Sequence, residues 1–147
     1  NYSMFSFFRD TKVVNLNKLI LPATTLAEWC YYDMFKNCSS LIEAPELPAT
    51  ELAEWCYHSM FYGCTSLTQA PALPATRLAD SCYEFMFYDC TLLSHIEALF
   101  TTTPGTSYTN SWVNGVANNG TFVKSSEATW NVTGVNGIPK GWTVTTN

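Results

Sequence analysis

Cysteine is the residue type of this sequence with the widest chemistry, since a thiolate can act as a nucleophile, a metal ligand or a disulfide partner. The six cysteines form two evenly spaced series with the same step along the chain: Cys30, Cys56 and Cys82, and Cys38, Cys64 and Cys90. No Cys-x2-Cys pair or cluster of histidines accompanies them, so we expect no zinc site. All six fall in apolar patterns, where a free thiol behaves as a small hydrophobe. We therefore predict unpaired, buried thiols and no disulfides.

The other candidates for catalysis are few. His58 and His95 are the only histidines, and neither lies in a known nucleophile or metal motif. Glu43 and Glu46 have the spacing of an acid–base pair, but we expect both to be solvated surface residues. We predict no enzymatic activity, no metal and no cofactor.

Composition excludes further classes of function. Only 13% of the residues are charged and the net charge is −5. Because no basic stripe is present, binding to nucleic acid is not expected. No apolar run reaches the length of a membrane span, which is roughly 18 residues. Hydrophobic residues make up 47% of the sequence, so the chain is expected to fold. Its length of 147 residues is typical of a single domain.

The cysteine spacing belongs to a larger repeat. Three copies without insertion or deletion follow the pattern LPATxLAxxCYxxMFxxCxxL. A period of this length indicates stacked units that bury their apolar faces against one another. Apolar residues three and four apart predict a helix over residues 25–37, and the proline-bounded residues 40–48 predict a short strand. We thus expect an α/β solenoid with one helix and one strand per unit and a parallel sheet.

The unit also resembles a known family. Met34-Phe35, Cys38, Ser40-Leu41 and Leu47-Pro48 occur in the order typical of BspA-like leucine-rich-repeat proteins, a family of bacterial surface proteins. This resemblance implies a leucine-rich-repeat solenoid, an extracellular location and a role in adhesion or protein binding. The third copy departs from the pattern after Cys90, so the repeats are expected to end near residue 100.

Three regions are predicted: a degraded N-terminal repeat over 1–21, three leucine-rich repeats over 22–100, and a β-rich cap over 101–147. The tail is rich in Thr, Asn and Gly and reads as short strands between turns. Its tryptophans, Trp112, Trp130 and Trp142, are either plugs that cover the last repeat or exposed platforms that could bind sugars.

Positions that vary between the copies are the candidates for partner contact, since the constant positions form the scaffold. On the predicted helices they are Trp29, Trp55, Tyr32, His58, Tyr62 and Tyr88, and on the predicted strands Glu43, Gln69 and His95. For Trp29 and Trp55 the alternative is that neighbouring helices pack these rings against each other. If these rings instead form an exposed aromatic patch, that patch is typical of an interaction site.

The resulting hypothesis is a non-enzymatic adhesion or recognition module, at the cell surface or secreted, that binds a protein or a surface glycan. The alternative is a structural subunit of a filament, a pilus-like or a phage-tail assembly. It depends on the N-terminal end, where Phe5, Phe7 and Phe8 would allow head-to-tail self-association.

Overall fold

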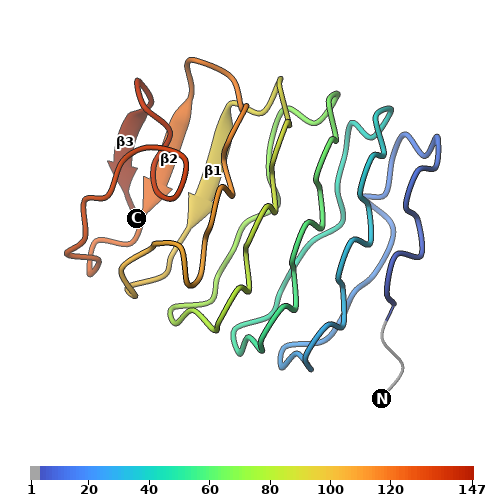
Figure 1. Ribbon diagram of the computed structural model, residues 1–147, viewed down its shortest axis with the longest axis horizontal. Helices are drawn as coiled ribbons and strands as arrows, with labels where there is room; N and C mark the ends of the chain where they lie inside the picture. Colours follow the sequence, from blue (N-terminus) through green and yellow to red (C-terminus); the bar gives the residue numbers. More distant parts are fainter. Residues whose placement is uncertain (1–3) are drawn as a thin grey trace.

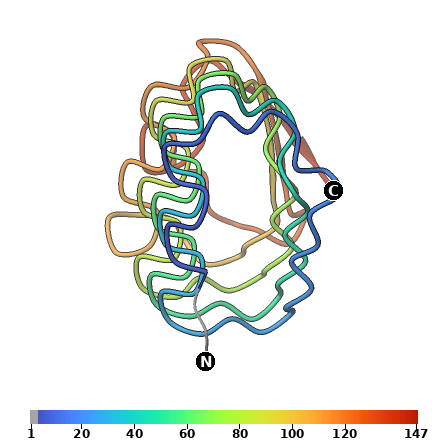
Figure 2. The same ribbon diagram turned by 90° about the vertical axis from the view of Figure 1, so that its right-hand side faces the viewer.

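The computed structural model describes residues 4–147. The chain winds through successive coils that lie side by side from the N-terminal to the C-terminal end (Figure 1), and in end view the coils overlie one another around an oval outline (Figure 2). The regular strands are β1 (His95–Ala98), β2 (Thr121–Lys124) and β3 (Thr143–Thr146). They form one parallel sheet in the order β1-β2-β3, with His95 opposite Thr121 and Thr121 opposite Thr143. The fold is therefore β-rich.

The predicted α/β leucine-rich-repeat solenoid, with a helix and a strand in each unit, is wrong. Residues 4–147 contain no helix, and residues 28–37 of the expected helix form a continuous run of turns. Regular strands are confined to residues 95–146 instead of recurring in every unit.

The backbone explains why turns replace the helix. Trp29, Asp33 and Asn37 have φ values of 62°, 56° and 59°. A positive φ at every fourth residue interrupts a right-handed helix. Apolar residues four apart, such as Cys30 and Met34, lie on one side of a helix and also on one side of a chain of four-residue turns. The spacing alone therefore could not distinguish the two structures.

Hydrogen bonding follows the same alternation. The N–H of Met34 donates to the C=O of Tyr31 in its own coil at 3.2 Å, and the next N–H, of Phe35, donates to the C=O of Met60 in the following coil at 2.9 Å. An α-helix would use all of these amides internally and leave none for the neighbouring coil. The turn segments that share this pattern, which we call the turn wall, are residues 5–10, 28–37, 54–63, 80–89 and 106–115.

The turn wall continues through the change in composition at Thr101. Ser81 donates to the C=O of Ser107 at 2.7 Å, and Phe87 donates to that of Trp112 at 2.9 Å. Residues 106–115 thus form one more coil in register, although their sequence no longer resembles the repeat.

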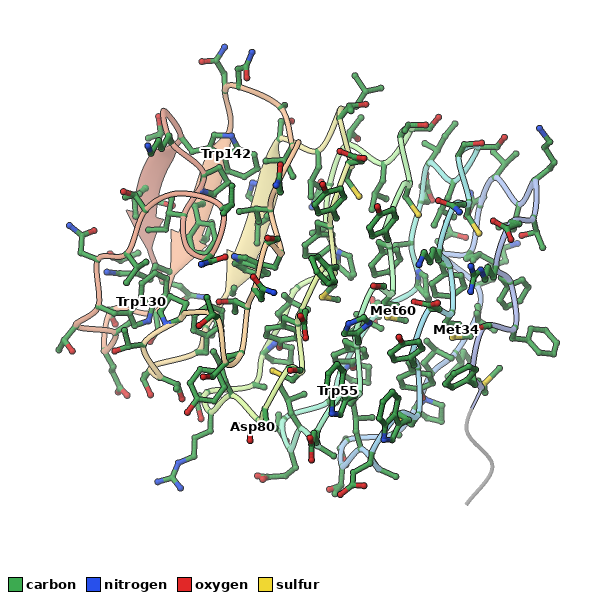
Figure 3. The ribbon with its side chains drawn as sticks, viewed as in Figure 1. Met34, Trp55, Met60, Asp80, Trp130 and Trp142 are labelled. Carbon is green, nitrogen blue, oxygen red and sulfur yellow. The ribbon has the colours of Figure 1, made fainter. Side chains whose placement is uncertain are left out.

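The core is built from rows of equivalent side chains, one from each coil. Phe35 stacks on Phe61 with ring centroids 5.4 Å apart, and Phe61 stacks on Phe87 at 5.8 Å. Met34 and Met60, which occupy equivalent places on neighbouring coils (Figure 3), are fully buried. Burying each such side chain contributes roughly 1.5–3 kcal/mol, so stacking in register is the main source of stability.

The opposite side of each coil is more extended, and we call it the strand wall: residues 13–17, 42–48 and 68–74 together with β1, β2 and β3. Outside the sheet it is paired only at single bridges, such as Asn15 with Glu43 and Gln69 with His95. The coil that forms β1 has Glu97 and Phe100 where earlier coils carry proline. Proline lacks an N–H and fixes φ, so it restricts regular strand pairing.

Candidate functional site

Most of the candidate residues gather on the outer side of the turn wall, in rows that run from coil to coil. The rings of Trp29 and Trp55 stack with centroids 5.0 Å apart and planes 6° from parallel. Tyr32 stacks on His58 at 4.5 Å and 7°, and Phe5 stacks on Tyr32 at 5.0 Å. We call this surface the aromatic face; its members are Phe5, Trp29, Tyr32, Trp55, His58, Tyr62 and Tyr88.

A parallel row completes the aromatic face. Tyr62 and Tyr88 stack with centroids 4.8 Å apart, and the ammonium group of Lys36 lies 4.8 Å from the centre of the Tyr62 ring. A cation over an aromatic ring is attracted by the negative face of the π system. The third member of the Trp29–Trp55 row is Ser81, so within residues 4–147 that row holds two rings.

The local backbone positions these rings. Trp29 and Trp55 both have a positive φ, of 62° and 60°. This conformation is unfavourable for bulky residues. Each also donates its N–H to the next coil, Trp29 to Glu54 and Trp55 to Asp80. The inter-coil hydrogen bonds therefore hold the indoles in register against their own backbone preference.

Exposure differs along the aromatic face. Trp29 is 41% exposed, whereas His58 is only 8% exposed beneath the neighbouring rings. Stacking covers ring faces, so the surface offered to a partner consists largely of ring edges. The rings of Trp29 and Trp55 therefore pack against each other, on turns and not on the expected helices, and Trp29 remains exposed.

A polar network lies beside the aromatic face. The Asp33 carboxylate accepts a hydrogen bond from Arg9 Nη1 at 3.1 Å and lies 3.8 Å from Lys36 Nζ. His58 Nε2 is 3.7 Å from a carboxylate oxygen of Glu84. Burial lowers the pKa of His58, while the nearby Glu84 and Asp33 carboxylates oppose that shift. Asp33 Oδ1 and His58 Nδ1 are buried without a hydrogen-bond partner among the described residues.

The strand-wall candidates lie apart from the aromatic face. Glu43 and Gln69 line a groove of about 640 Å³ between residues 42–48 and 68–74. His95 begins β1, paired with Gln69 and Thr121, and is not part of the groove lining. The structure thus brings together two of the three predicted strand-side residues.

The groove was missed by the sequence reasoning, as were several of the residues that form it. Its lining includes Pro45, Pro48, Pro71 and Pro74, whereas proline served above only to bound the predicted strand over residues 40–48. Phe5 and Phe85 were likewise not predicted to accompany the aromatic face; the Phe85 ring meets His58 edge-on at 5.6 Å. The proline pairs were the available signal, since they mark segments that resist strand pairing.

The tail tryptophans are buried, as the plug interpretation expected. Figure 3 shows Trp130 and Trp142 near the strands of the C-terminal end. Each indole N–H donates to a backbone carbonyl: Trp112 to Gly137, Trp130 to Phe100 and Trp142 to Ala117. These rings are therefore not platforms for a sugar.

The six cysteines are unpaired; five are buried and Cys30 is partly exposed. One series forms a ladder of thiol hydrogen bonds: Cys64 Sγ donates to the C=O of Phe35 at 3.2 Å and Cys90 Sγ to that of Phe61 at 3.0 Å. Burial raises the pKa of Cys82 to about 12. Such thiols are poor nucleophiles at neutral pH.

Two further features bear on the class of protein. Within residues 4–147, no three His, Cys, Asp or Glu side chains gather in an arrangement suited to a metal ion. The same part of the chain holds no helix with the length and apolar character needed to cross a membrane.

The resemblance of the repeat to BspA-like units remains a prediction, although the helix-and-strand fold that it implied is wrong. Comparison of the chain with models of protein families, with curated proteins and with solved structures gives no match.

Proposed function

We propose that this protein is a non-enzymatic recognition module, at the cell surface or secreted, that contacts a protein partner through its aromatic face. The observation that carries the proposal is the set of stacked, partly exposed rings on a wall that hydrogen bonds hold in place. Rigid aromatic side chains supply contact area with little loss of conformational entropy, and they are enriched at protein interfaces. The extracellular location is supported by the resemblance to surface-protein repeats.

The orientation of the rings favours a protein over a glycan. A sugar ring stacks on the face of an aromatic side chain, and the Trp29–Trp55 stack at 5.0 Å takes up one face of each indole. The exposed edges carry partial positive charge and suit carbonyl and carboxylate oxygens of a protein surface.

The absence of catalysis is part of the proposal. The thiols that could act as nucleophiles are largely buried, and burial raises the pKa of Cys30 and of Cys38 as well as that of Cys82. His58, the one histidine near a carboxylate among the described residues, lies under stacked rings and is 8% exposed. Neither arrangement offers an accessible reacting group.

An array of extracellular proteins and glycans, probed with the labelled chain, would identify a ligand, and surface plasmon resonance would then compare variants. We expect the Trp29→Ala, Trp55→Ala double variant to lose at least roughly tenfold in affinity for a protein ligand. The matched control is the Gln69→Ala, His95→Ala double variant on the strand wall, which should bind like the wild type. Unchanged binding by a folded Trp29, Trp55 variant, or binding to glycans alone, would contradict the proposal.

A structural assembly subunit is the second candidate, favoured by the N-terminal edge. Phe7 is 66% and Ile20 is 78% exposed at this edge. No residue of the described chain donates to the C=O groups of Phe5 and Phe7, which face away from the second coil. Light scattering over a range of concentrations tests this candidate. Growth in mass that Phe7→Ser with Ile20→Ser abolishes would support assembly, and a monomer at all concentrations would exclude it.

A further inference from the structure

The strand wall is unpaired between the second coil, which contains residues 42–48, and the third coil, which contains residues 68–74. No backbone hydrogen bond joins residues 42–48 to residues 68–74 in the described structure. On either side of this gap the pairing is present: Leu16 donates to the C=O of Glu43, and Ala70 donates to that of His95. The groove of about 640 Å³ occupies the gap.

Backbone groups at the two sides of the gap have no partner. Neither the N–H nor the C=O of Ala44 or of Gln69 makes a hydrogen bond within residues 4–147. Backbone groups of consecutive residues in an extended chain point in opposite directions. Because Glu43 faces the first coil and Ala70 faces the fourth, Ala44 and Gln69 direct their backbone groups toward the groove.

The charged side chains that line the groove are all acidic. Its lining holds two carboxylates, Glu43 and Glu46, and no Lys, Arg or His. Asn17 Nδ2 donates to Glu43 at 2.8 Å, while Glu46 makes no ion pair or hydrogen bond among the described residues. Proline and aliphatic side chains such as Pro45, Pro71 and Ile42 form the rest of the surface. This combination suits a cationic group on an apolar stem.

We propose that the groove binds an extended, lysine- or arginine-containing peptide segment of a partner protein. The peptide backbone bonds to Ala44 and Gln69, as in the addition of a strand to an open sheet edge. Its cationic side chains pair with Glu43 and Glu46, and its aliphatic stems lie on the prolines. The groove volume falls within the range of sites that enclose small ligands, so it holds a few residues of such a segment. This site is separate from the aromatic face and does not depend on the function proposed for that face.

Titration calorimetry with the full chain and a capped Lys-Val-Lys-Val-Lys-Val-Lys peptide tests the proposal. We expect saturable binding that weakens at high salt. Glu43→Gln with Glu46→Gln should reduce the affinity roughly tenfold or more. The matched control, Glu28→Gln with Glu127→Gln, removes two exposed carboxylates that do not line the groove and should leave the affinity unchanged.

Two further probes separate a peptide groove from a nonspecific acidic surface. A peptide with N-methyl groups on alternate residues keeps the charge but loses backbone donors, and it should bind roughly tenfold more weakly. Amide exchange at Ala44 and Gln69 should slow when the unmethylated peptide binds. Equal binding of the N-methylated peptide or of spermine, equal loss in both pairs of variants, or no binding at all would overturn the proposal. Aromatic-face variants should bind the peptide normally, so this proposal and the function proposed above can fail independently.

Discussion

The two long walls of this molecule come from the same sequence repeat, yet one is continuous and the other is not. On the turn wall, hydrogen bonds join every described coil to the next, from Met4 donating to Cys30 through to Asp89 donating to Asn114. On the strand wall, the pairing stops between residues 42–48 and 68–74 and resumes beyond them. A regular sequence period therefore does not guarantee regular pairing, because backbone chemistry decides it on each wall separately.

The difference follows from the residues that each wall carries. The turn wall has no proline in residues 28–37, 54–63 or 80–89, so every amide there can donate. Proline occupies two positions in both coils that border the groove, namely Pro45 and Pro48, and Pro71 and Pro74. The wall without proline holds the molecule together, and the wall with proline provides an opening for a ligand.

The largest effect is expected from the interior of the turn wall. Phe61 is fully buried between Phe35 and Phe87. Phe61→Ala should therefore lower the free energy of unfolding by about 3–5 kcal/mol. Its neighbour Tyr62 lies on the outer surface, and Tyr62→Ala should lower it by about 1 kcal/mol or less. Urea denaturation followed by circular dichroism measures both. Similar losses in the two variants would contradict the assignment of inner and outer rows.

The thiols report whether the coils stay stacked. Cys30 is partly exposed and the other five cysteines are buried, and burial raises the pKa of all six thiols. Alkylation at mildly alkaline pH, mapped by mass spectrometry, should label Cys30 first, with the others labelled only at the rate of unfolding. Rapid labelling of Cys64 under native conditions would contradict the stacked arrangement, because its thiol donates a hydrogen bond to the C=O of Phe35 in the preceding coil.

Replacing a glycine by alanine should destabilise the protein more on the turn wall than outside it. Gly63 has a φ of +73°, and a Cβ there would approach Asn37 Oδ1. Gly63→Ala is expected to destabilise the fold by about 1–2 kcal/mol, mostly through backbone strain. Gly105 is the matched control, since a Cβ there meets nothing within 4 Å, and Gly105→Ala should change stability little. Thermal denaturation of both variants checks the prediction; equal melting temperatures would contradict it.

The smallest expected effect is a pH dependence of folding stability that arises from His58 on the aromatic face. Burial lowers the folded-state pKa of His58. Below its unfolded pKa of about 6.5, the unfolded chain therefore binds a proton that the folded chain does not. Stability should fall as the pH drops below that value, until the folded pKa is reached. His58→Tyr keeps a ring in the row and should remove this part of the pH dependence. Urea midpoints measured across mildly acidic to neutral pH test it, and identical slopes for the two proteins would contradict the assignment.

Part of this architecture could be predicted from the sequence. The constant spacing of Cys38, Cys64 and Cys90 predicted that equivalent residues stack, and their thiols follow one another from coil to coil. Asn37, Gly63 and Asp89 are residue types that tolerate positive φ, which all three adopt. Each is the last of three positive-φ positions in its turn segment, a pattern that the predicted helix over residues 25–37 does not contain.

The remainder depends on interactions between coils. Trp29 and Phe85 are not residue types that signal positive φ, and only the hydrogen bonds to the next coil explain their conformation. Residues 106–115 keep the register through backbone bonds after the repeat pattern has ended. The groove arises from two neighbouring coils that both carry proline, and inspection of a single unit cannot show such a pair.

Residue-resolved amide exchange of the free protein tests the central claim, a continuous turn wall opposite an interrupted strand wall, most directly. We predict strong protection at Phe35, Phe61 and Ala70, whose amides donate to the next coil. The amides of Ala44 and Gln69, which border the groove, should exchange close to the rate of an unprotected chain. Protection of Ala44 and Gln69 equal to that of Ala70 would show that the strand wall is closed and would contradict this account.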